Sequence, residues 1–519
     1  MSGQRETWRT HLGMIFAMIG TEVGLGNIWR FPYLCGKYGG GSFLVPYMVL
    51  LLGVAIFGMM AEWVVGRHTR RGPMGAFQKI RFPFGRDVGA WGVIGPFFLY
   101  SYYIVVTAWV LFFIVASVAG LYFGKETMEY FLGFLGSPWV FVAHAAAVAF
   151  TSVVLSFGVQ KGIERACKVM IPALFVLLIV VAIRSLTLPG AAAGVEFYMR
   201  PRWEGIANPE AWLAALGQVF FTLSLGMGAM VIYGSYMKKS WGIPLNAVAC
   251  SLGNTSASIL AGFAIFPAAF ALGLGGDVQG AKSIGLTFTV LPKVFAEMPV
   301  GWLFGGLFFI LLAFGALSSA ISIQEPSIAW MKDELRWPRR KSALLTGGIL
   351  WVMGLPFVLN GFIRHGAGGV PAGLGEKLAL LGKMDSIINN LGLPLFALLA
   401  ILAVGWVMKN KGFEELNRNA RFRIGGWVKP WMRYVVPAIF LFVFVVNLLN
   451  VLFPSLQKQV LGEAKLPDFV PIGLTPATVI TIIVVCGVVW GGAIGGLLTV
   501  VGIERRKERR AAAQGGGTD

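Results

Sequence analysis

Twelve long apolar segments constrain the fold of this 519-residue chain more than any other feature of its sequence. A helix needs roughly 20 mainly apolar residues to cross a lipid bilayer. Only 13% of the residues are charged, whereas 56% are hydrophobic. We therefore predict an all-α polytopic membrane protein whose helices lie at about 13–36, 42–66, 87–122, 140–158, 162–185, 210–235, 243–272, 297–331, 342–361, 378–408, 431–454 and 475–503.

The distribution of the 43 Lys and Arg residues predicts the orientation of these helices. Short cytoplasmic loops carry an excess of basic residues, and most of the basic residues here lie in the two tails and in alternate loops, such as 67–86. We expect a cell (inner or plasma) membrane protein with both termini cytoplasmic and no cleavable signal peptide. Topology and anionic lipid explain the net charge of +19, so we expect lipid and no nucleic acid as a partner. The sequence does not indicate an oligomeric state.

The first predicted span is interrupted at its centre by residues 20–27, which read Gly-Thr-Glu-Val-Gly-Leu-Gly-Asn. Unsatisfied backbone groups at membrane depth are costly, so broken helices occur there only where they line a cavity. Their freed carbonyls and half-helix ends then become ligands for ions and small charged solutes. This segment therefore predicts a solute-binding site near the middle of the membrane.

The sixth predicted span is interrupted in a similar way. Residues 218–228 read Gln-Val-Phe-Phe-Thr-Leu-Ser-Leu-Gly-Met-Gly, with glycines and hydroxyls in the middle of an apolar run. Glycines can also serve close helix packing, but the breaks occupy matching positions, the first span of each five-helix half. That arrangement is typical of an inverted repeat around a midplane site in a secondary transporter.

Two charged residues inside the apolar spans require partners. Glu62 in the second span needs hydrogen-bond donors or a raised pKa, and we expect the orphaned N–H groups of the first span to supply the donors. A structural role for Glu62 is thus favoured over proton transport. Arg30 lies in the outer third of the first span. It either extends to the outer surface or pairs with a carboxylate, and the residues alone leave both interpretations open.

The motifs resemble those of the neurotransmitter:sodium symporter family, whose bacterial amino-acid members have the LeuT-type fold. The signature comprises Gly-Leu-Gly-Asn at 24–27, Arg-Phe-Pro at 30–32, three glycines at 39–41, Glu-Trp at 62–63, Lys-Gly-Ile-Glu at 161–164 and the 218–226 run. The resemblance covers nearly the whole chain. It implies twelve transmembrane helices with a 5+5 inverted repeat and broken helices 1 and 6.

By this resemblance the domains are a cytoplasmic tail (1–12), a ten-helix transport core (13–409), peripheral helices 11 and 12 (410–503) and a basic cytoplasmic tail (504–519). The implied activity is sodium-coupled symport of a small amino acid or related amine by alternating access. The implied substrate site comprises Thr21, Glu22, Gly24, Leu25, Gly26, Leu99, Tyr103, Phe221, Thr222, Ser224, Met227, Ser319 and Ile323.

The resemblance also implies ion sites and gates. The first sodium would bind the carbonyl of Glu22 with Asn27, Thr222 and Asn254, and the second would bind Gly20, Val23, Gly315, Ser318 and Ser319. All-oxygen ligation suits a hard cation. Chloride is implied by serine at 258, with Tyr47, Gln218 and Thr222 as further donors. The outer gate would be Arg30 with Asp385, and the inner gate Arg5 with Asp333, near Trp8 and Tyr236.

Glu22 departs from the family, which commonly has a small uncharged residue at this position. Its carboxylate could bind a cationic group on the substrate, replace chloride as the balancing anion, carry a proton, or bond the backbone at the break. The position of Gly24 argues against a monoamine, because family members for carboxylate-free amines tend to have aspartate there. An amino acid is therefore our first expectation, and a cationic or carboxylate-free amine recognised through Glu22 is the alternative.

Two other classes of function are disfavoured. A channel or sensor on the same fold would not need two apposed gates. An enzyme would need a nucleophile with a base, or a metal cluster, but the four histidines are scattered along the chain. The cysteines Cys35, Cys167, Cys250 and Cys486 show no metal or disulfide spacing either.

Overall fold

The structure, a computed structural model, describes residues 5–280, 283–366 and 378–452, so the predicted twelfth span and the C-terminal tail lie outside the described residues. The described residues form helices and loops without a β-strand. The helices are α1 (His11–Glu22), α2 (Phe31–Lys37), α3 (Gly41–Leu50), α4 (Ile56–Thr69), α5 (Pro73–Lys79), α6 (Gly85–Val118), α7 (Thr127–Leu135), α8 (Trp139–Ser156), α9 (Glu164–Leu186), α10 (Ala191–Met199), α11 (Trp203–Ile206), α12 (Pro209–Thr222), α13 (Ala229–Tyr236), α14 (Ile243–Ala271), α15 (Gly275–Gly280), α16 (Ser283–Gly285), α17 (Leu291–Glu297), α18 (Gly301–Glu334), α19 (Arg339–Gly366), α21 (Ala379–Ile387), α22 (Leu393–Leu402), α23 (Asn410–Asn417), α24 (Val428–Pro430) and α25 (Val436–Leu452).

Short π-helical turns join several of these helices into longer rods, as at Leu51–Ala55 between α3 and α4. Within the described residues, nine helices are long and apolar enough to cross a membrane, and α1 with Gly26–Lys37 forms a bent pair that gives a tenth candidate. The predicted sixth span is the pair α12 and α13. Every predicted span except the last therefore coincides with a long helix, with the bent pair or with α12 and α13, which confirms the all-α polytopic architecture.

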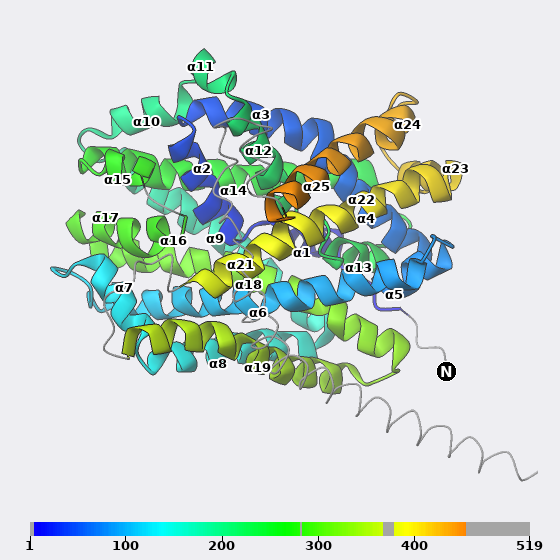
Figure 1. Cartoon of the computed structure of the whole chain (residues 1–519), viewed down its shortest axis with the longest axis horizontal. Helices are drawn as coiled ribbons and strands as arrows, with labels where there is room; N and C mark the ends of the chain where they lie inside the picture. Colours follow the sequence, from blue (N-terminus) through cyan, green and yellow to red (C-terminus); the bar gives the residue numbers. More distant parts are fainter. Residues whose placement is uncertain (1–4, 281–282, 367–377, 453–519) are drawn as a thin grey trace, which may run out of the picture.

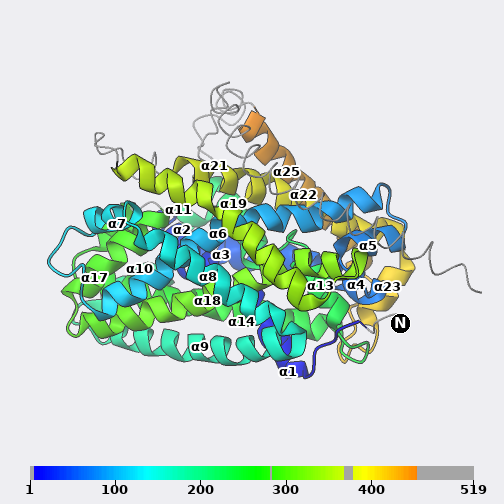
Figure 2. The same ribbon diagram turned by 90° about the horizontal axis from the view of Figure 1, so that it is seen from below.

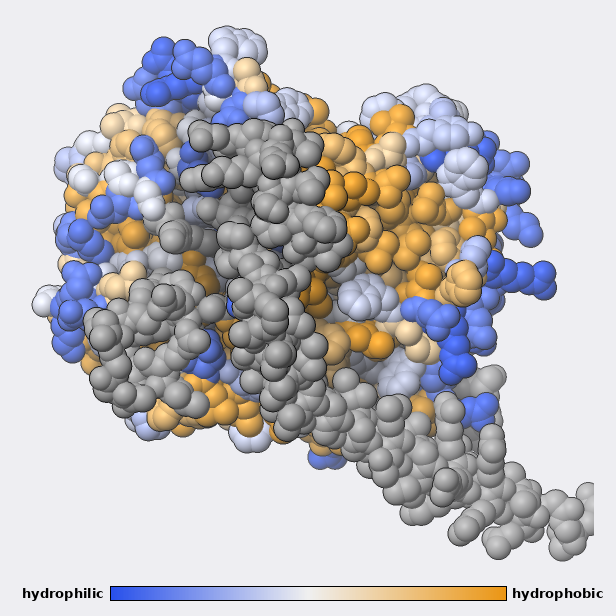
Figure 3. All heavy atoms as spheres, viewed as in Figure 1, coloured by the Kyte–Doolittle hydropathy of each residue, from blue (hydrophilic) through white to orange (hydrophobic). Residues whose placement is uncertain are grey.

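The long helices run along the longest axis of the molecule (Figures 1 and 2). One end of that axis carries the N-terminus, α5 and α23, and the other carries α7 and α17 (Figure 1). On the face shown in Figure 3, the largest apolar area lies between the two ends of this axis, and hydrophilic residues gather at those ends. This distribution suits helices that cross an apolar layer with their ends in water.

The first span bends by 55° at the predicted break. α1 ends at Glu22, Val23 adopts an extended backbone with φ −78° and ψ 104°, and the chain resumes as a π-helical turn over Gly26–Arg30. The start of α1 is held against α9, because the Glu164 carboxylate accepts hydrogen bonds from the Arg9 amide at 2.7 Å and the Thr10 hydroxyl at 2.7 Å. The break thus leaves the carbonyls at the end of α1 facing the core.

The sixth span breaks between α12 and α13, where Gly226 has φ +79° and Ser224 has φ +51°. Glycine adopts this left-handed conformation without steric cost. The freed amide of Gly226 donates a hydrogen bond to Glu62 Oε1 at 2.7 Å. Glu62 is completely buried, so its carboxylate holds the break of the sixth span. We expected an N–H group of the first span to donate a hydrogen bond to Glu62, but the donor comes from the sixth span.

The helices α4 and α13 touch through their main chains. A Cβ atom built at Gly66 of α4 would collide with the carbonyl oxygen of Val231, and one built at Gly234 of α13 would lie 2.8 Å from the Cα of Trp63. Small residues permit this close approach of two transmembrane helices. At these two glycines the main chains of the second span and of the second half of the sixth span are therefore in direct contact.

Candidate functional site

A small cavity, which we call the inner cavity, lies at the two breaks. It has a volume of about 20 Å³, and its lining combines the end of α1 with α6, the broken sixth span and α18. The lining residues are Thr21, Glu22, Gly24, Leu25, Gly26, Leu99, Tyr103, Phe221, Ser224, Met227, Ser319 and Ile323. The structure thus brings together every predicted substrate residue except Thr222, which lies outside this lining.

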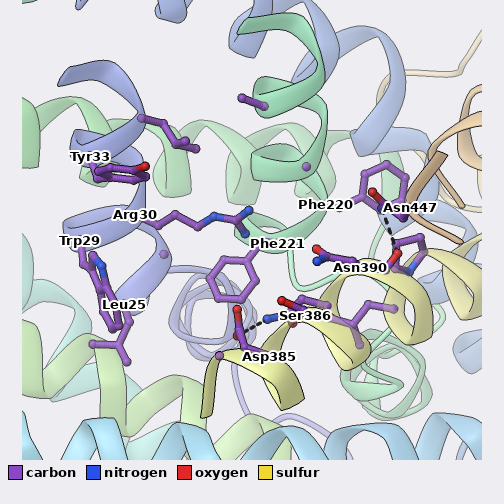
Figure 4. A pocket seen from close by; sticks show the side chains of 18 of the residues that line it. Leu25, Trp29, Arg30, Tyr33, Phe220, Phe221, Asp385, Ser386, Asn390 and Asn447 are labelled. Carbon is purple, nitrogen blue, oxygen red and sulfur yellow. Dashed lines mark hydrogen bonds between the residues drawn. The ribbon is translucent and has the colours of Figure 1, made fainter. Parts of the chain in front are cut away.

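A larger cavity of about 260 Å³, the outer cavity, lies on the other side of Phe221 (Figure 4). Its lining includes the predicted gate residues Arg30 and Asp385. α25 also contributes, through Val443, Val446 and Asn447. Sequence analysis treated this helix as peripheral and did not anticipate its role in the lining, because an asparagine in one apolar helix gives no indication of what it faces.

Four residues separate the two cavities, because Leu25, Gly26, Tyr103 and Phe221 line both. The Arg30 guanidinium lies 5.3 Å from the centre of the Phe221 ring, within cation–π range. In Figure 4 the ring is drawn between the Arg30 guanidinium and the Asp385 carboxylate. Asp385 also accepts a hydrogen bond from Asn389 at 2.5 Å. The Phe221 ring between the two cavities therefore has a positive group, Arg30, on one side and a negative group, Asp385, on the other.

The predicted ligands of the first sodium form a buried cluster. The Asn27 amide donates to the side-chain oxygen of Asn254 at 2.6 Å and to the Thr222 hydroxyl at 3.0 Å. The Asn254 amide also donates to Thr222 at 3.0 Å. This brings side chains from the first, sixth and seventh spans together next to the carbonyl end of α1. Neutral oxygens in such an arrangement suit a hard monovalent cation.

The predicted ligands of the second sodium meet where α1 packs against α18. The Ser319 hydroxyl lies 3.3 Å from the carbonyl oxygen of Gly20 and 3.4 Å from that of Val23. Ser318 donates to the carbonyl of Gly315 at 3.0 Å. A third carbonyl, that of Thr21, lies 3.3 Å from Ser319. Two groups of oxygen atoms therefore flank the broken end of α1.

The predicted chloride residues are buried together beside the first cluster. The Tyr47 hydroxyl faces Thr222 and Ser258, and it has no hydrogen-bond partner among the described residues. Ser258 accepts a hydrogen bond from the Asn27 amide at 2.8 Å, so its own proton is available. Gln218 instead donates to the carbonyl of Gly26 at 3.0 Å. The hydroxyls fit an anion, and the Gln218 amide gives one of its two protons to the Gly26 carbonyl.

The end of the molecule with the N-terminus is closed by direct contacts among the predicted inner-gate residues. The Arg5 guanidinium lies 2.5 Å from Asp333 Oδ1 and donates to Ser235 at 2.8 Å. It also lies 5.0 Å from the centre of the Tyr236 ring. Trp8 is fully buried and contacts Tyr236 edge to face, with 5.9 Å between the ring centroids.

A second group of charges behind this contact was missed by sequence analysis. Buried Glu325 of α18 forms an ion pair with Arg339 at 2.6 Å and accepts a hydrogen bond from Tyr236 at 2.6 Å. Glu6 reaches the same arginine at 2.8 Å and Lys332 at 2.8 Å. Burial raises the pKa of Glu6, but Arg339 and Lys332 outweigh burial and lower it overall. Glu325 lies within the predicted eighth span. A charged residue inside an apolar span requires a partner, and that rule could have identified it.

Comparisons with known proteins agree with this architecture. A family model described as the sodium:neurotransmitter symporter family matches residues 5–131 and 127–491. An uncharacterized sodium-dependent transporter of Methanocaldococcus jannaschii is 34% identical over 467 residues, which cover 86% of this chain and 92% of the relative. An uncharacterized sodium-dependent transporter of Bacillus subtilis is 34% identical over 468 residues, which cover 87% of this chain and 100% of the relative.

One similar solved structure is the crystal structure of MhsT in complex with L-phenylalanine. The two structures superpose with a TM-score of 0.74 at 36% sequence identity, and the match covers 85% of this chain and 99% of MhsT. MhsT is a transporter of the LeuT-type fold, so this match confirms the predicted fold.

Proposed function

Because the chain belongs to the sodium:neurotransmitter symporter family, and is therefore a sodium-dependent membrane transporter and not an enzyme, we propose that it transports a small amino acid or related amine. The observation that carries this proposal is the inner cavity, which lies between two groups of buried oxygen atoms at the broken end of α1. Solute and sodium would then bind next to each other, so each would favour the binding of the other.

The proposed roles follow the two groups. Asn27, Thr222, Asn254 and the Glu22 carbonyl bind one sodium, and the carbonyls of Gly20, Val23 and Gly315 with Ser318 and Ser319 bind the second. The substrate occupies the inner cavity, with its amine near the carbonyl end of α1. That MhsT was solved with L-phenylalanine supports an amino-acid-like substrate.

We assign the closed end, with Arg5 and Asp333, to the cytoplasmic side, in keeping with the basic loops found there. The outer cavity then faces the outside of the cell, and the structure corresponds to an outward-facing conformation. Transport requires Arg30 and Asp385 to close over Phe221 and the Arg5 contact to open. Sodium and substrate drive this change because they bind the two conformations with different affinity.

Chloride is the proposed third solute. The buried hydroxyls of Tyr47, Ser258 and Thr222 supply donors for an anion, and an anion beside the first sodium would offset its charge in a low-dielectric environment. Chloride binding is a separate element of the proposal, since the sodium groups do not depend on it.

The experiment that tests this function is a screen of the purified protein against amino acids and amines, with sodium or chloride replaced in turn. A ligand that binds the folded state raises the unfolding temperature. We expect stabilisation that requires sodium and weakens when gluconate replaces chloride. Stabilisation without sodium contradicts the symport proposal, whereas indifference to chloride removes only the assignment of Ser258 and Tyr47.

A further inference from the structure

We propose that the Glu22 carboxylate binds a positively charged group of the substrate, so that this site selects organic cations. The class comprises amines without a carboxylate and amino acids with a second positive charge. This inference rests on the proposed function and names the substrate class of the same cavity. It also resolves the choice between amino acid and cationic amine in favour of the cation.

Glu22 is an ionisable side chain without a partner in the centre of the protein. It is 3% exposed and lines the inner cavity. Neither of its carboxylate oxygens has a hydrogen-bond partner among the described residues. The interpretation in which this side chain bonds the backbone at the break is therefore unsupported.

Three of the four hydroxyl groups that line the cavity direct their protons elsewhere, and the fourth, that of Tyr103, has no hydrogen-bond partner among the described residues. Ser224 donates to the Thr21 carbonyl at 2.8 Å. Thr21 itself lies 3.0 Å from the carbonyl of Ala17 and 2.8 Å from the Ser322 hydroxyl. Ser319 points toward the carbonyl oxygens at the end of α1. None of these four hydroxyl groups therefore donates a hydrogen bond to Glu22 in this structure.

The surroundings of the carboxylate also lack a positive charge. Among the residues that line the inner cavity, none is Lys, Arg or His. Glu22 is the last residue of α1, and the carbonyl end of a helix carries a partial negative charge. The potential in this part of the cavity is therefore negative from two sources, and a buried unpaired carboxylate is strongly unfavourable. The missing complement is a cation that enters with the solute.

The structure explains why the acid stands at position 22 and not two residues later. A Cβ atom built at Gly24 would lie 2.5 Å from the Ser319 hydroxyl and 2.9 Å from the Tyr103 hydroxyl. A longer side chain at Gly24 has no room in this conformation. Position 22, in contrast, holds a full-length side chain, and Glu22 is part of the cavity lining.

Three cations could neutralise Glu22: the substrate ammonium, a sodium ion in the neighbouring oxygen cluster, or a proton. A carboxyl group that is simply protonated would give Glu22→Gln and the unaltered protein equal affinity for every ligand. We assign the carboxylate to the substrate because Glu22 is part of the cavity lining and because Thr222 and Asn254 already offer neutral oxygens to a sodium ion in the neighbouring cluster. The experiment below separates these sources.

The test compares matched ligands on the purified full-length protein. Each set consists of a neutral amino acid, the amine that lacks its carboxyl group, and a diamino acid of similar size. Affinity is measured by thermal stabilisation and competition at saturating sodium, and the sodium requirement is measured with each ligand. Glu22→Gln removes the charge at nearly constant shape, Glu22→Asp keeps it, and Glu196→Gln is the control at an exposed pair with Arg200.

We expect the unaltered protein to bind the cationic members more tightly than the neutral one. Glu22→Gln should weaken cationic ligands by about tenfold or more, as for loss of a charged hydrogen bond, with neutral ligands and the sodium half-saturation nearly unchanged. Glu22→Asp should retain part of the preference, and Glu196→Gln all of it.

Three results overturn the inference. One is a rise in the sodium requirement of Glu22→Gln with every ligand, which assigns the carboxylate to sodium. Another is equal binding of all ligands by Glu22→Gln and the unaltered protein. The third needs no variant and holds even if Glu22→Gln fails to fold: the unaltered protein prefers neutral amino acids. If no ligand stabilises the unaltered protein in sodium, the proposed function itself fails.

Discussion

The two ends of the path through the transport core use the same kinds of residue in different arrangements. At the N-terminal end, Arg5 contacts Asp333 directly at 2.5 Å and Trp8 is fully buried. At the other end, Arg30 and Asp385 both line a cavity of about 260 Å³, with the Phe221 ring beside them. An arginine, a carboxylate and an aromatic ring thus form a closed contact at one end and the wall of a cavity at the other.

This difference indicates which contacts favour the observed conformation over the inward-open one. The closed end is cross-linked over long sequence distances, since residues 5 and 6 reach Ser235, Asp333 and Arg339. At the hollow end Arg30 and Asp385 line a cavity, so closure of that end requires new contacts. We therefore expect substitutions at the closed end to change the conformational equilibrium more than those at the hollow end.

The largest effect is expected for Arg5→Ala. The variant removes two charged hydrogen bonds to Asp333, a loss of about 2 kcal/mol that corresponds to a shift of roughly 30-fold toward the inward-open conformation. Cys167 lies behind α1, next to Gly20, so displacement of α1 exposes its thiol. In a background with the other three cysteines replaced by serine, maleimide labelling of Cys167 should become faster.

The control for this experiment is Arg200→Ala, which breaks an exposed pair far from the path. Its labelling rate should match that of the background protein. Unchanged labelling in Arg5→Ala would show that the Arg5 contact does not hold the inner end closed, and the contrast between the two ends would then disappear.

A smaller effect is expected for Arg30→Ala. This variant removes the cation–π contact with Phe221, which contributes about 1 kcal/mol, so ligand affinity should fall by roughly fivefold. The loss should appear as faster ligand dissociation, because the outer side closes less firmly, whereas Cys167 labelling stays unchanged. A labelling increase as large as that of Arg5→Ala would mean that the two ends are equally important in this conformation.

The smallest effect is expected for Glu6→Gln, as a function of pH. The folded pKa of Glu6 is lowered by Arg339 and Lys332 against the effect of burial. Its contribution is therefore fully present above the unfolded pKa of about 4.3 and is lost as the pH falls through the lower folded value. Because Glu6 is partly exposed, we expect at most about 1 kcal/mol at pH 7.

The measurement is the difference in unfolding temperature between Glu6→Gln and the unaltered protein from pH 7 to pH 3. The difference should shrink below about pH 4.3. Glu129→Gln, at an exposed position of α7, should show little difference at any pH. A gap that grows on acidification would contradict the assigned direction of the Glu6 pKa.

Residues that act locally could be predicted from the sequence. Both helix breaks follow from glycines and polar groups in apolar runs, since few other residues tolerate an interrupted backbone there. The inner cavity required the family resemblance, because Leu99 and Ile323 look like ordinary apolar residues of their spans. The partners of Glu62 and Glu325 could not be predicted, because Gly226 and Arg339 meet them only after folding.

The main-chain contact between α4 and α13 has a mechanical consequence. Helices separated by side chains can slide as rotamers change, but here the main chains touch at Gly66 and Gly234. The hydrogen bond that the Gly226 amide donates to Glu62 joins the same two spans at the break. The second span and the inner half of the sixth span should therefore move together as one rigid body. Arg5 is bound to this rigid body through Ser235 of α13 and to α18 through Asp333. Breaking the Arg5 contacts would therefore allow both spans to move, and not α13 alone.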